Sequence, residues 1–296
     1  MSLFTITIPA SSANIGPGFD SMGMAIKRYL TLHVMEQDQW EFEHRSPFLP
    51  VEANYENHFI YLIALKIAKQ YKKTLPACKV IVESDIPLAR GLGSSASAVI
   101  AGIELANQLC ALSLTTEEKL HLATEIEGHP DNVAPALLGG FVISATSSKK
   151  QVDYIQVQDL DLDIVLYIPD VELKTDDARK VLPVVFSREY ATSASGISNL
   201  MIASLLVKNY ELAGKMMEED QFHEPFRAKL IPNYHLIKKE ARNLGAFGTV
   251  ISGAGPSMIS FVPKDQGQAI ATKMKSILPT YDVGALKIDC SGLQVS

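Results

Sequence analysis

The sequence predicts a mixed fold in which helices and strands are interleaved along the chain. Short apolar runs typical of strands, such as residues 78–83 and 163–168, alternate with segments whose apolar residues recur at helical spacing, such as 57–71. The chain has 296 residues, 47% hydrophobic and 20% charged, which is an ordinary globular balance. This length is sufficient for two domains or one large one. The pattern indicates the mixed class but leaves the strand order open.

The individual elements are predicted from local composition and periodicity. Apolar runs predict strands at residues 3–8, 29–35, 78–83, 141–145, 163–168, 249–252, 258–262 and 285–289. Apolar residues at helical spacing, or a helix-start signal, predict helices at residues 57–71, 95–109, 115–127, 199–207, 234–244 and 266–278. Residues 9–23, rich in Gly, Pro, Ser and Asn, are expected to form a loop. The polar stretch 147–158 predicts a boundary between two domains, residues 1–155 and 156–296.

Composition argues against several classes of partner. The net charge of −6 provides no basic face for nucleic acid or for an anionic membrane. Three cysteines without metal-ligand spacing (Cys78, Cys110 and Cys290) favour a reducing, intracellular compartment. The N-terminus lacks the features of a signal peptide, and the longest uncharged run, 243–263, is interrupted by Gly and Pro. We therefore expect a soluble, cytoplasmic protein.

A Gly- and Ser-rich turn precedes the predicted helix 95–109. It consists of Pro87, Leu88, Ala89, Arg90, Gly91, Leu92, Gly93, Ser94, Ser95, Ala96 and Ser97. Such a turn presents unpaired N–H groups and the positive end of the helix dipole, which together bind anions such as phosphate. The alternative is a plain loop and helix cap. The run matches neither the nucleotide loop that ends in Lys-Ser/Thr nor the dinucleotide fingerprint.

The run Pro-x-x-x-Gly-Leu-Gly-Ser-Ser-Ala at residues 87–96 resembles the phosphate-loop signature of the GHMP kinases. These small-molecule kinases are named after galactokinase, homoserine kinase, mevalonate kinase and phosphomevalonate kinase. Residues 9–20 and 127–135 resemble the homoserine kinase branch, and the resemblance extends from about residue 5 to the C-terminus. It implies a two-domain α+β fold, with an N-terminal ATP-binding domain like ribosomal protein S5 domain 2 and a ferredoxin-like C-terminal domain. The active site is then expected in the cleft between them.

The resemblance also implies an activity. The expected reaction is ATP-dependent phosphorylation of the L-homoserine side-chain hydroxyl to O-phospho-L-homoserine, for threonine biosynthesis, with ATP and Mg²⁺ as cofactors. The expected partners are these small molecules, with a homodimer as a further expectation. Two alternatives stay open: a sibling kinase acting on mevalonate or a sugar, and a non-catalytic relative that binds ligand.

The resemblance implies a magnesium site beside the phosphate loop. Mg²⁺ prefers hard oxygen ligands and usually takes one or two from the protein. In the family, the second serine of the loop and a Glu on the next helix hold the metal. The matching residues are Ser95 and Glu127, with Glu125 as an alternative. A solvated acid at the end of a helix is the non-functional interpretation.

The segment around Asp131 and Asn132 is the predicted catalytic region. An Asp-Asn pair after a proline is commonly a turn or a cap, but the resemblance places His129, Asp131 and Asn132 near the acceptor. Asp131 could act as a general base, although the ordinary Asp pKa of about 3.9 makes it a weak one. Alternatively, Asn132 orients the hydroxyl and the γ-phosphate takes the proton during transfer. The sequence leaves both mechanisms open.

Charged residues elsewhere match positions that contact homoserine in the family. Asp20, in the first loop, suits the substrate ammonium group, and Arg179 and Arg227 suit its carboxylate, because Arg grips a carboxylate through two parallel N–H bonds. The expected substrate-binding set is Asn14, Asp20, His129, Asn132, Thr175, Arg179, Arg227, Gly253 and Gly255. A turn former or a surface Arg is the non-functional interpretation of each polar member.

Overall fold

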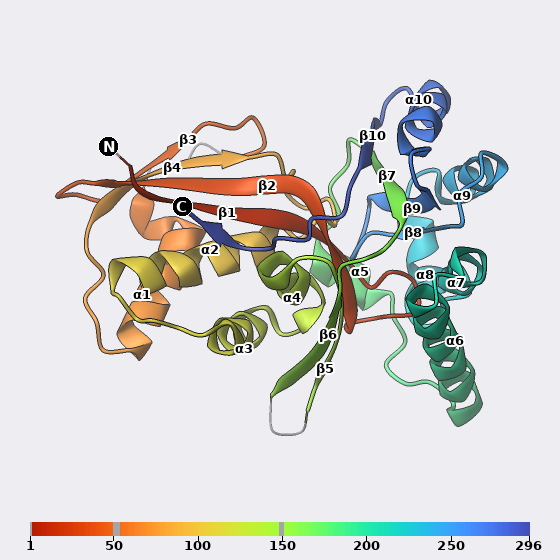
Figure 1. Cartoon of the computed structure of the whole chain (residues 1–296), viewed down its shortest axis with the longest axis horizontal. Helices are drawn as coiled ribbons and strands as arrows, with labels where there is room; N and C mark the ends of the chain where they lie inside the picture. The colour runs from red at the N-terminus through yellow and green to blue at the C-terminus, as the bar shows by residue number, and fades with distance from the viewer. Residues whose placement is uncertain (1, 50–53, 148–150) are drawn as a thin grey trace.

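The computed structural model describes residues 2–49, 54–147 and 151–296. It contains two β-sheets side by side along the long axis of the molecule (Figure 1). The larger sheet consists of β1 (Ser2–Ala13), β2 (Met22–Glu36), β3 (Glu41–His44), β4 (Cys78–Ser84), β5 (Phe141–Thr146), β6 (Val152–Val157) and β11 (Gln294–Val295). The smaller sheet consists of β7 (Leu162–Ile168), β8 (Gly248–Ile251), β9 (Met258–Pro263) and β10 (Asp282–Leu286).

The helices are divided between the two sheets. Four lie on one side of the larger sheet in Figure 1: α1 (Phe59–Gln70), α2 (Ser94–Leu109), α3 (Thr116–Glu127) and α4 (Pro130–Leu138). Around the smaller sheet lie α5 (Thr175–Lys180), α6 (Arg188–Leu206), α7 (Tyr210–Met217), α8 (Glu224–Arg227), α9 (Tyr234–Asn243) and α10 (Gly267–Ile277). Short 3₁₀ turns occur at η1 (Tyr55–Asn57) and η2 (Ala228–Leu230). The arrangement is a two-part α+β fold, as predicted. Every helix in the described part of the chain is too short or too polar to cross a lipid bilayer.

Strand pairing defines the order of the strands within each sheet. The larger sheet runs β11-β1-β2-β4-β3, with β5 beside β2 and β6 beside β5, and the smaller runs β10-β7-β9-β8. Within the described residues β3 and β4 form the one parallel pair. The final strand β11 pairs with β1, so both ends of the described chain lie in the larger sheet (Figure 1).

One large apolar core extends through both sheets. In β7, Ile164 and Leu166 belong to this core, whereas Val165 and Tyr167 face a second core with α9 and α10. Successive strand residues point to opposite faces, so both faces of β7 are covered and the whole strand is buried. The smaller sheet is therefore fixed against the larger one by shared side-chain packing.

Most predicted elements are present, with corrections where tertiary pairing decides the outcome. The predicted loop 9–23 is shorter, because β1 and β2 form ladder pairs such as Ala13 with Gly23. The polar stretch 147–158 contains β6, although residues 148–150 lie outside the described residues. The helix predicted at 199–207 is the second half of α6, and the strand predicted at 285–289 lies at β10. The sequence analysis missed β3, β11, α4, α5, α7 and α8.

The predicted domain division falls inside a strand. β6 pairs with β5 as far as Val157, so a boundary between residues 155 and 156 would cut the larger sheet. The change of sheet occurs between β6 and β7. We therefore propose that the division follows Val157 and that β11 belongs to the first unit.

Gly23 in β2 packs so closely on α4 that it leaves no room for a side chain. A Cβ atom at Gly23 would overlap the carbonyl oxygen of Asp131 and lie 2.9 Å from Cγ of Pro135. We expect Gly23→Ala to lower the free energy of unfolding by about 2–3 kcal/mol, because over-packing forces the backbone apart. Urea unfolding measures this change.

Gly196→Ala in α6 is the matched control. Nothing lies within 4 Å of a Cβ atom at Gly196. This change should raise the free energy of unfolding by up to about 1 kcal/mol, because Ala is a better helix former than Gly. Equal urea midpoints for the two variants would contradict the tight contact between β2 and α4.

Candidate active site

Two cavities lie on either side of the first turn of α2. The apolar cavity, of about 410 Å³, is lined by Leu30, His44, Leu49, Asn57, His58, Phe59, Ile60, Val82, Ser84, Ile86, Leu88, Ser94, Ser95 and Ala98. The polar cavity, of about 270 Å³, is lined by Asn14, Asp20, Ala89, Gly91, Leu92, Gly93, Ser94, Ser95, Glu127, His129, Asp131, Asn132, Leu173, Lys174, Thr175, Arg179, Arg227, Gly253 and Ala254. Ser94 and Ser95 line both, so the N-terminus of α2 separates the two.

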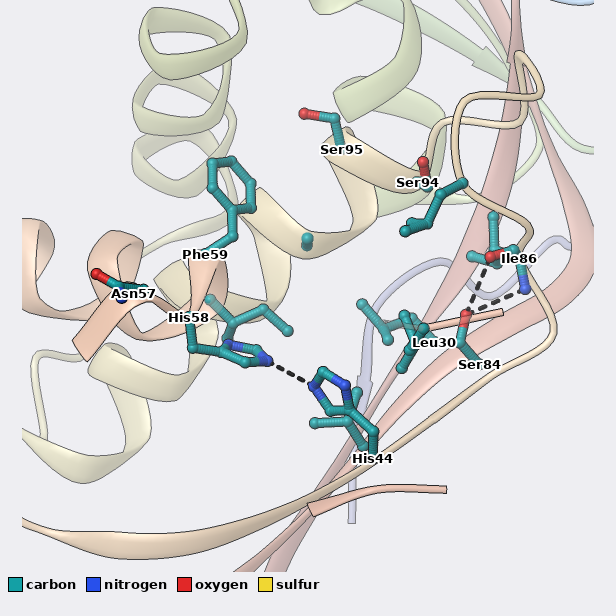
Figure 2. Close-up of a pocket in the computed structure, with 14 residues that line it drawn as sticks. Leu30, His44, Asn57, His58, Phe59, Ser84, Ile86, Ser94 and Ser95 are labelled. Carbon is teal, nitrogen blue, oxygen red and sulfur yellow. Dashed lines mark hydrogen bonds between the residues drawn. The ribbon is translucent and has the colours of Figure 1, made fainter. Parts of the chain in front are cut away.

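The apolar cavity carries a histidine pair but little charge. Figure 2 shows the His58 ring directed at His44, with 2.8 Å between their Nε2 atoms. His58 also stacks on Phe42, with ring centroids 3.8 Å apart. Burial, reinforced by His44, lowers the pKa of His58 to about 4. His58 is therefore neutral near pH 7, as an apolar ligand requires.

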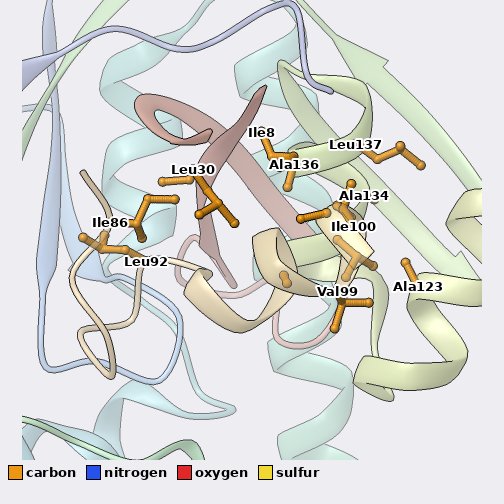
Figure 3. Close-up of a cluster of buried hydrophobic side chains, with 14 of the residues drawn as sticks. Ile8, Leu30, Ile86, Leu92, Val99, Ile100, Ala123, Ala134, Ala136 and Leu137 are labelled. Carbon is orange, nitrogen blue, oxygen red and sulfur yellow. The ribbon is translucent and has the colours of Figure 1, made fainter. Parts of the chain in front are cut away.

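The turn before α2, residues 87–95, is anchored by its apolar side chains. Ile86, immediately before it, and Leu92 within it are each about 1% exposed and belong to the large core, on the side of Leu30 in β2 (Figure 3). Gly93 caps the helix at φ 68°, where glycine has no steric penalty. The first-turn N–H groups and the positive end of the helix dipole therefore face the cavities, a geometry that suits an anion.

Backbone contacts join this turn to both sheets. The Ser252 hydroxyl, just after β8, donates to the carbonyl oxygen of Gly91 (2.7 Å) and lies 2.8 Å from Oγ of Ser12 in β1. The N–H of Gly253 donates to the carbonyl oxygen of Ala13 (3.0 Å). A Cβ atom at Gly91 would overlap the Ser252 carbonyl oxygen. The three segments therefore meet at backbone contact distance.

The loop after β1 holds a strained conformation. Asn14, Ile15 and Asp20 all have positive φ, at 70°, 50° and 55°. For a β-branched residue such as Ile15 this conformation is rare, and surrounding contacts must enforce it. Asn14 supplies two of them: its Nδ2 donates to the Gly253 carbonyl (2.8 Å), and its Oδ1 accepts from the Asp20 N–H (3.0 Å). The hydrogen bonds of Asn14 hold the loop in this strained conformation and so keep Asp20 at the cavity.

The start of α4 carries three of the predicted residues. Pro130 occupies the first helical turn, where its missing N–H costs nothing, and His129 precedes it. Nδ1 of His129 contacts Oδ1 of the buried Asp131. Burial lowers the pKa of His129, but the hydrogen bond with Asp131 and the charges of Asp131 and Asp20 outweigh it and raise that pKa overall. Oδ1 of Asn132 accepts from the Ser11 hydroxyl (2.9 Å).

Glu127 lies beside Ser95, whereas Glu125 does not. The Ser95 hydroxyl donates to Oε2 of Glu127 (3.0 Å), at the end of α3. Burial raises the pKa of Glu127, although the bond from Ser95 and the charge of His129 oppose that rise. The helix α3 ends at Glu127 because Gly128 caps it in the left-handed conformation, at φ 92°. Glu125 is exposed and lines neither cavity.

The arginines differ in how their charge is compensated. Arg179 forms two hydrogen bonds to Asp20, at 2.7 and 3.2 Å. Arg227 is 1% exposed and donates to the carbonyl oxygens of Ala178 (3.1 Å) and Gly253 (3.2 Å). Within the described residues no carboxylate forms an ion pair with Arg227, and burial together with Arg179 lowers its pKa to about 10. A buried, charged arginine without a carboxylate is typical of an anion-binding site.

The polar cavity collects most of the residues predicted from the sequence. From the predicted substrate, catalytic and metal sets it gathers Asn14, Asp20, Ser95, Glu127, His129, Asp131, Asn132, Thr175, Arg179, Arg227 and Gly253. Predicted residues that line neither cavity are Pro87, Arg90, Ala96, Ser97, Gly255 and Glu125, and Leu88 lines the apolar one.

Local contacts explain why three of these predicted residues lie outside both cavities. Ser97 is fully buried and donates to the carbonyl oxygens of Pro9 and Gly93. Arg90 donates to the carbonyl oxygen of Pro169. Gly255 packs near Ile231. These groups support the site from outside it.

Sequence reasoning missed several lining residues. In the polar cavity these are Leu173, Lys174 and Ala254, and in the apolar cavity the histidine pair and its apolar neighbours. No local pattern marks them, because separate segments contribute them. One feature of the sequence could have indicated the apolar cavity: His58, a polar residue at the start of the strongly apolar helix α1.

Comparison with known proteins places this architecture in a family. The model of the GHMP kinase N-terminal domain matches residues 58–140, and the model of the GHMP kinase C-terminal domain matches residues 201–280. The chain therefore has the fold of a GHMP-type phosphotransferase, a class that uses ATP.

Individual relatives narrow the assignment. The homoserine kinase of Oceanobacillus iheyensis is 54% identical over 100% of this chain and 99% of its own length. That of Bacillus licheniformis is 44% identical over 99% and 95%, respectively. The crystal structure of homoserine kinase from Cytophaga hutchinsonii matches with a TM-score of 0.85 at 29% identity, covering 99% of this chain and 97% of that chain. The chain belongs to the homoserine kinase branch of the GHMP kinase family.

Proposed function

We propose that the protein transfers the γ-phosphoryl group of ATP to the side-chain hydroxyl of L-homoserine, forming O-phospho-L-homoserine and ADP for threonine biosynthesis. The observation that carries the proposal is the position of Ser94 and Ser95 between an apolar and a polar cavity. A nucleotide laid across them would have its base on one side and its terminal phosphate on the other. A cytoplasmic location, which supplies ATP, is part of the proposal, and a homodimer stays a prediction.

The apolar cavity suits the adenine ring. Adenine is flat, aromatic and uncharged, and the cavity offers aliphatic walls with a neutral His58. From there the phosphates would reach the first turn of α2, whose N–H groups stabilise negative charge. The phosphate loop is therefore part of the proposal, with Leu88 in the apolar cavity on the side of the base.

The charges of the polar cavity complement a zwitterion. Asp20 offers a carboxylate to the substrate ammonium group, and Arg227 offers a guanidinium to its carboxylate. Arg179, which is paired with Asp20, lines the same cavity. Mevalonate has a carboxylate but no ammonium, so it would leave Asp20 without a substrate cation. A neutral sugar has neither group, so it would leave both Asp20 and Arg227 without a substrate partner.

The donor set beside α2 fits a magnesium ion. Ser95 and Glu127 offer hard oxygen atoms 3.0 Å apart at the wall of the polar cavity, and such atoms are the ligands that Mg²⁺ prefers. When bound there, Mg²⁺ would neutralise charge on the phosphates of ATP.

The side chains favour transfer without a protein base. Asp131 is buried, and its Oδ1 is already engaged by Nδ1 of His129, so this oxygen is not free to accept the hydroxyl proton. Asn132 is fixed by Ser11 and keeps its amide N–H₂ to orient the acceptor hydroxyl. The new O–P bond forms as the bond to ADP breaks, and the hydroxyl proton passes to the transferred phosphoryl group.

Asp131→Asn distinguishes the two mechanisms. We expect kcat to fall by less than about tenfold, because loss of a general base typically costs about 10²–10⁴-fold. Steady-state ADP release measures kcat, with exposed Asp153→Asn in β6 as the matched control. A fall above about 100-fold with an unchanged melting temperature would restore the base mechanism.

Glu127→Gln tests the metal site. The Mg²⁺ concentration for half-maximal ADP release should rise by about tenfold or more, because a charged ligand is lost. Glu125→Gln makes the same substitution two residues away on the exposed face and should change it by less than about twofold. Equal effects of the two variants would exclude Glu127 as a ligand.

Coupled ADP release across homoserine, mevalonate, galactose and threonine tests the function itself. We expect turnover with homoserine at a kcat/KM at least about 100-fold above the others, because mevalonate and galactose lack the ammonium group that would face Asp20 and threonine presents its hydroxyl at a different carbon. Threonine, with its hydroxyl one carbon closer to the amino group, controls for acceptor position.

Two results would contradict the proposal. Turnover of mevalonate but not homoserine would assign a sibling kinase. ATP binding without turnover of any of the four acceptors would support a non-catalytic ligand-binding relative.

A further inference from the structure

His223 lines neither cavity, yet it contacts three parts of the site. It is fully buried, at the residue that precedes α8. Its Nε2 lies 2.9 Å from the Gly16 carbonyl oxygen in the first loop, and its Nδ1 lies 3.3 Å from Nη1 of Arg227. Its ring stacks on Phe19, with centroids 5.5 Å apart. The side chain therefore links the loop that carries Asp20 to Arg227.

The contacts of His223 define its tautomer. A carbonyl oxygen only accepts, so Nε2 carries the hydrogen and donates to Gly16. Nδ1 is then a bare acceptor, which is what the guanidinium N–H of Arg227 needs. A neutral imidazole makes both bonds at once, whereas a doubly protonated ring would present an N–H to Arg227.

The backbone around His223 is held by a buried acid. Asp220 accepts from the N–H groups of His223 (2.9 Å) and Glu224 (2.7 Å) and lies 3.6 Å from Nε2 of His223. Glu224 in turn accepts from the Ile251 N–H (2.6 Å) in β8. The smaller sheet therefore fixes the backbone of His223, and the His223 ring contacts the first loop from this fixed position.

Phe19 lies between the two arginines. The guanidinium carbons of Arg179 and Arg227 lie 5.5 and 5.4 Å from its ring centroid, within the range of cation–π attraction. Phe19 adjoins Asp20 and stacks on His223. One aromatic surface therefore sets the orientation of both guanidinium groups relative to Asp20.

We propose that His223, as its neutral Nε2–H tautomer, is a positioning residue for substrate specificity: it fixes the spacing between Asp20, which binds the ammonium group, and Arg227, which binds the carboxylate. This inference rests on the proposed function. It assigns discrimination of an α-amino acid to a residue that touches no substrate. Nucleotide binding, on the far side of Ser94, does not depend on it.

His223→Gln tests the link, because Gln can still donate to Gly16 but lacks the ring acceptor that faces Arg227. We expect KM for homoserine to rise about tenfold and KM for ATP to change by less than about twofold. Exposed His121→Gln in α3 is the matched control. If the variant does not fold, Phe19→Leu removes the ring beneath both guanidinium groups and should produce the same selective rise.

A double variant separates positioning from general structural support. If His223 acts through Arg227, KM for homoserine in His223→Gln/Arg227→Lys should stay within about twofold of that in Arg227→Lys alone. Additive effects, an equal rise in KM for ATP, or an unchanged KM for homoserine would overturn the inference. If the wild-type protein does not phosphorylate homoserine at all, the proposed function itself fails, whatever the variants do.

Discussion

The Ser252 hydroxyl makes the contact on which the rest of the site depends. It joins Gly91 before α2 to Ser12 in β1, while Ser252 itself follows β8 of the smaller sheet. Ser12 and Ser252 are fully buried, where an unmade hydrogen bond costs about 1–3 kcal/mol. Because the large core also extends through both sheets, the two units meet in a fixed relation. The polar cavity exists where these segments converge.

The charges around this junction account for the chemistry. Arg227 remains buried without a carboxylate, while Arg179 and Asp20 neutralise each other across the cavity. An amino acid zwitterion would supply the missing anion and a cation for Asp20 together, which recovers free energy spent on burying charge. His129 is the partner of Asp131, because its Nδ1 contacts Oδ1 of that buried carboxylate. The cavity therefore provides orientation and charge compensation, which phosphoryl transfer mainly requires.

A local signal predicted one part of the site: the Gly-rich turn located Ser94 and Ser95, because this signal acts within one turn of chain. Asp131 and Asn132 were predicted from the family resemblance, since α4 itself was not predicted. Long-range contacts were not predictable: Ser252 and Gly91 are 161 residues apart, and His223 and Gly16 are 207 apart. The strand β6 was hidden because Asp153 and Gln156 interrupt its apolar residues, and α4 because it is short and carries Pro135 in its interior. Ser97 resembled a ligand in sequence, yet helix geometry directs its hydroxyl to the Pro9 carbonyl.

A crystal structure with a non-hydrolysable ATP analogue, Mg²⁺ and L-homoserine tests the central claim most directly. We expect the base in the apolar cavity, the terminal phosphate at the first turn of α2, and the homoserine carboxylate on Arg227 with its hydroxyl toward Asn132. A triphosphate bound elsewhere, with residues 87–95 packed away from it, would show that this turn is not the phosphate-binding site.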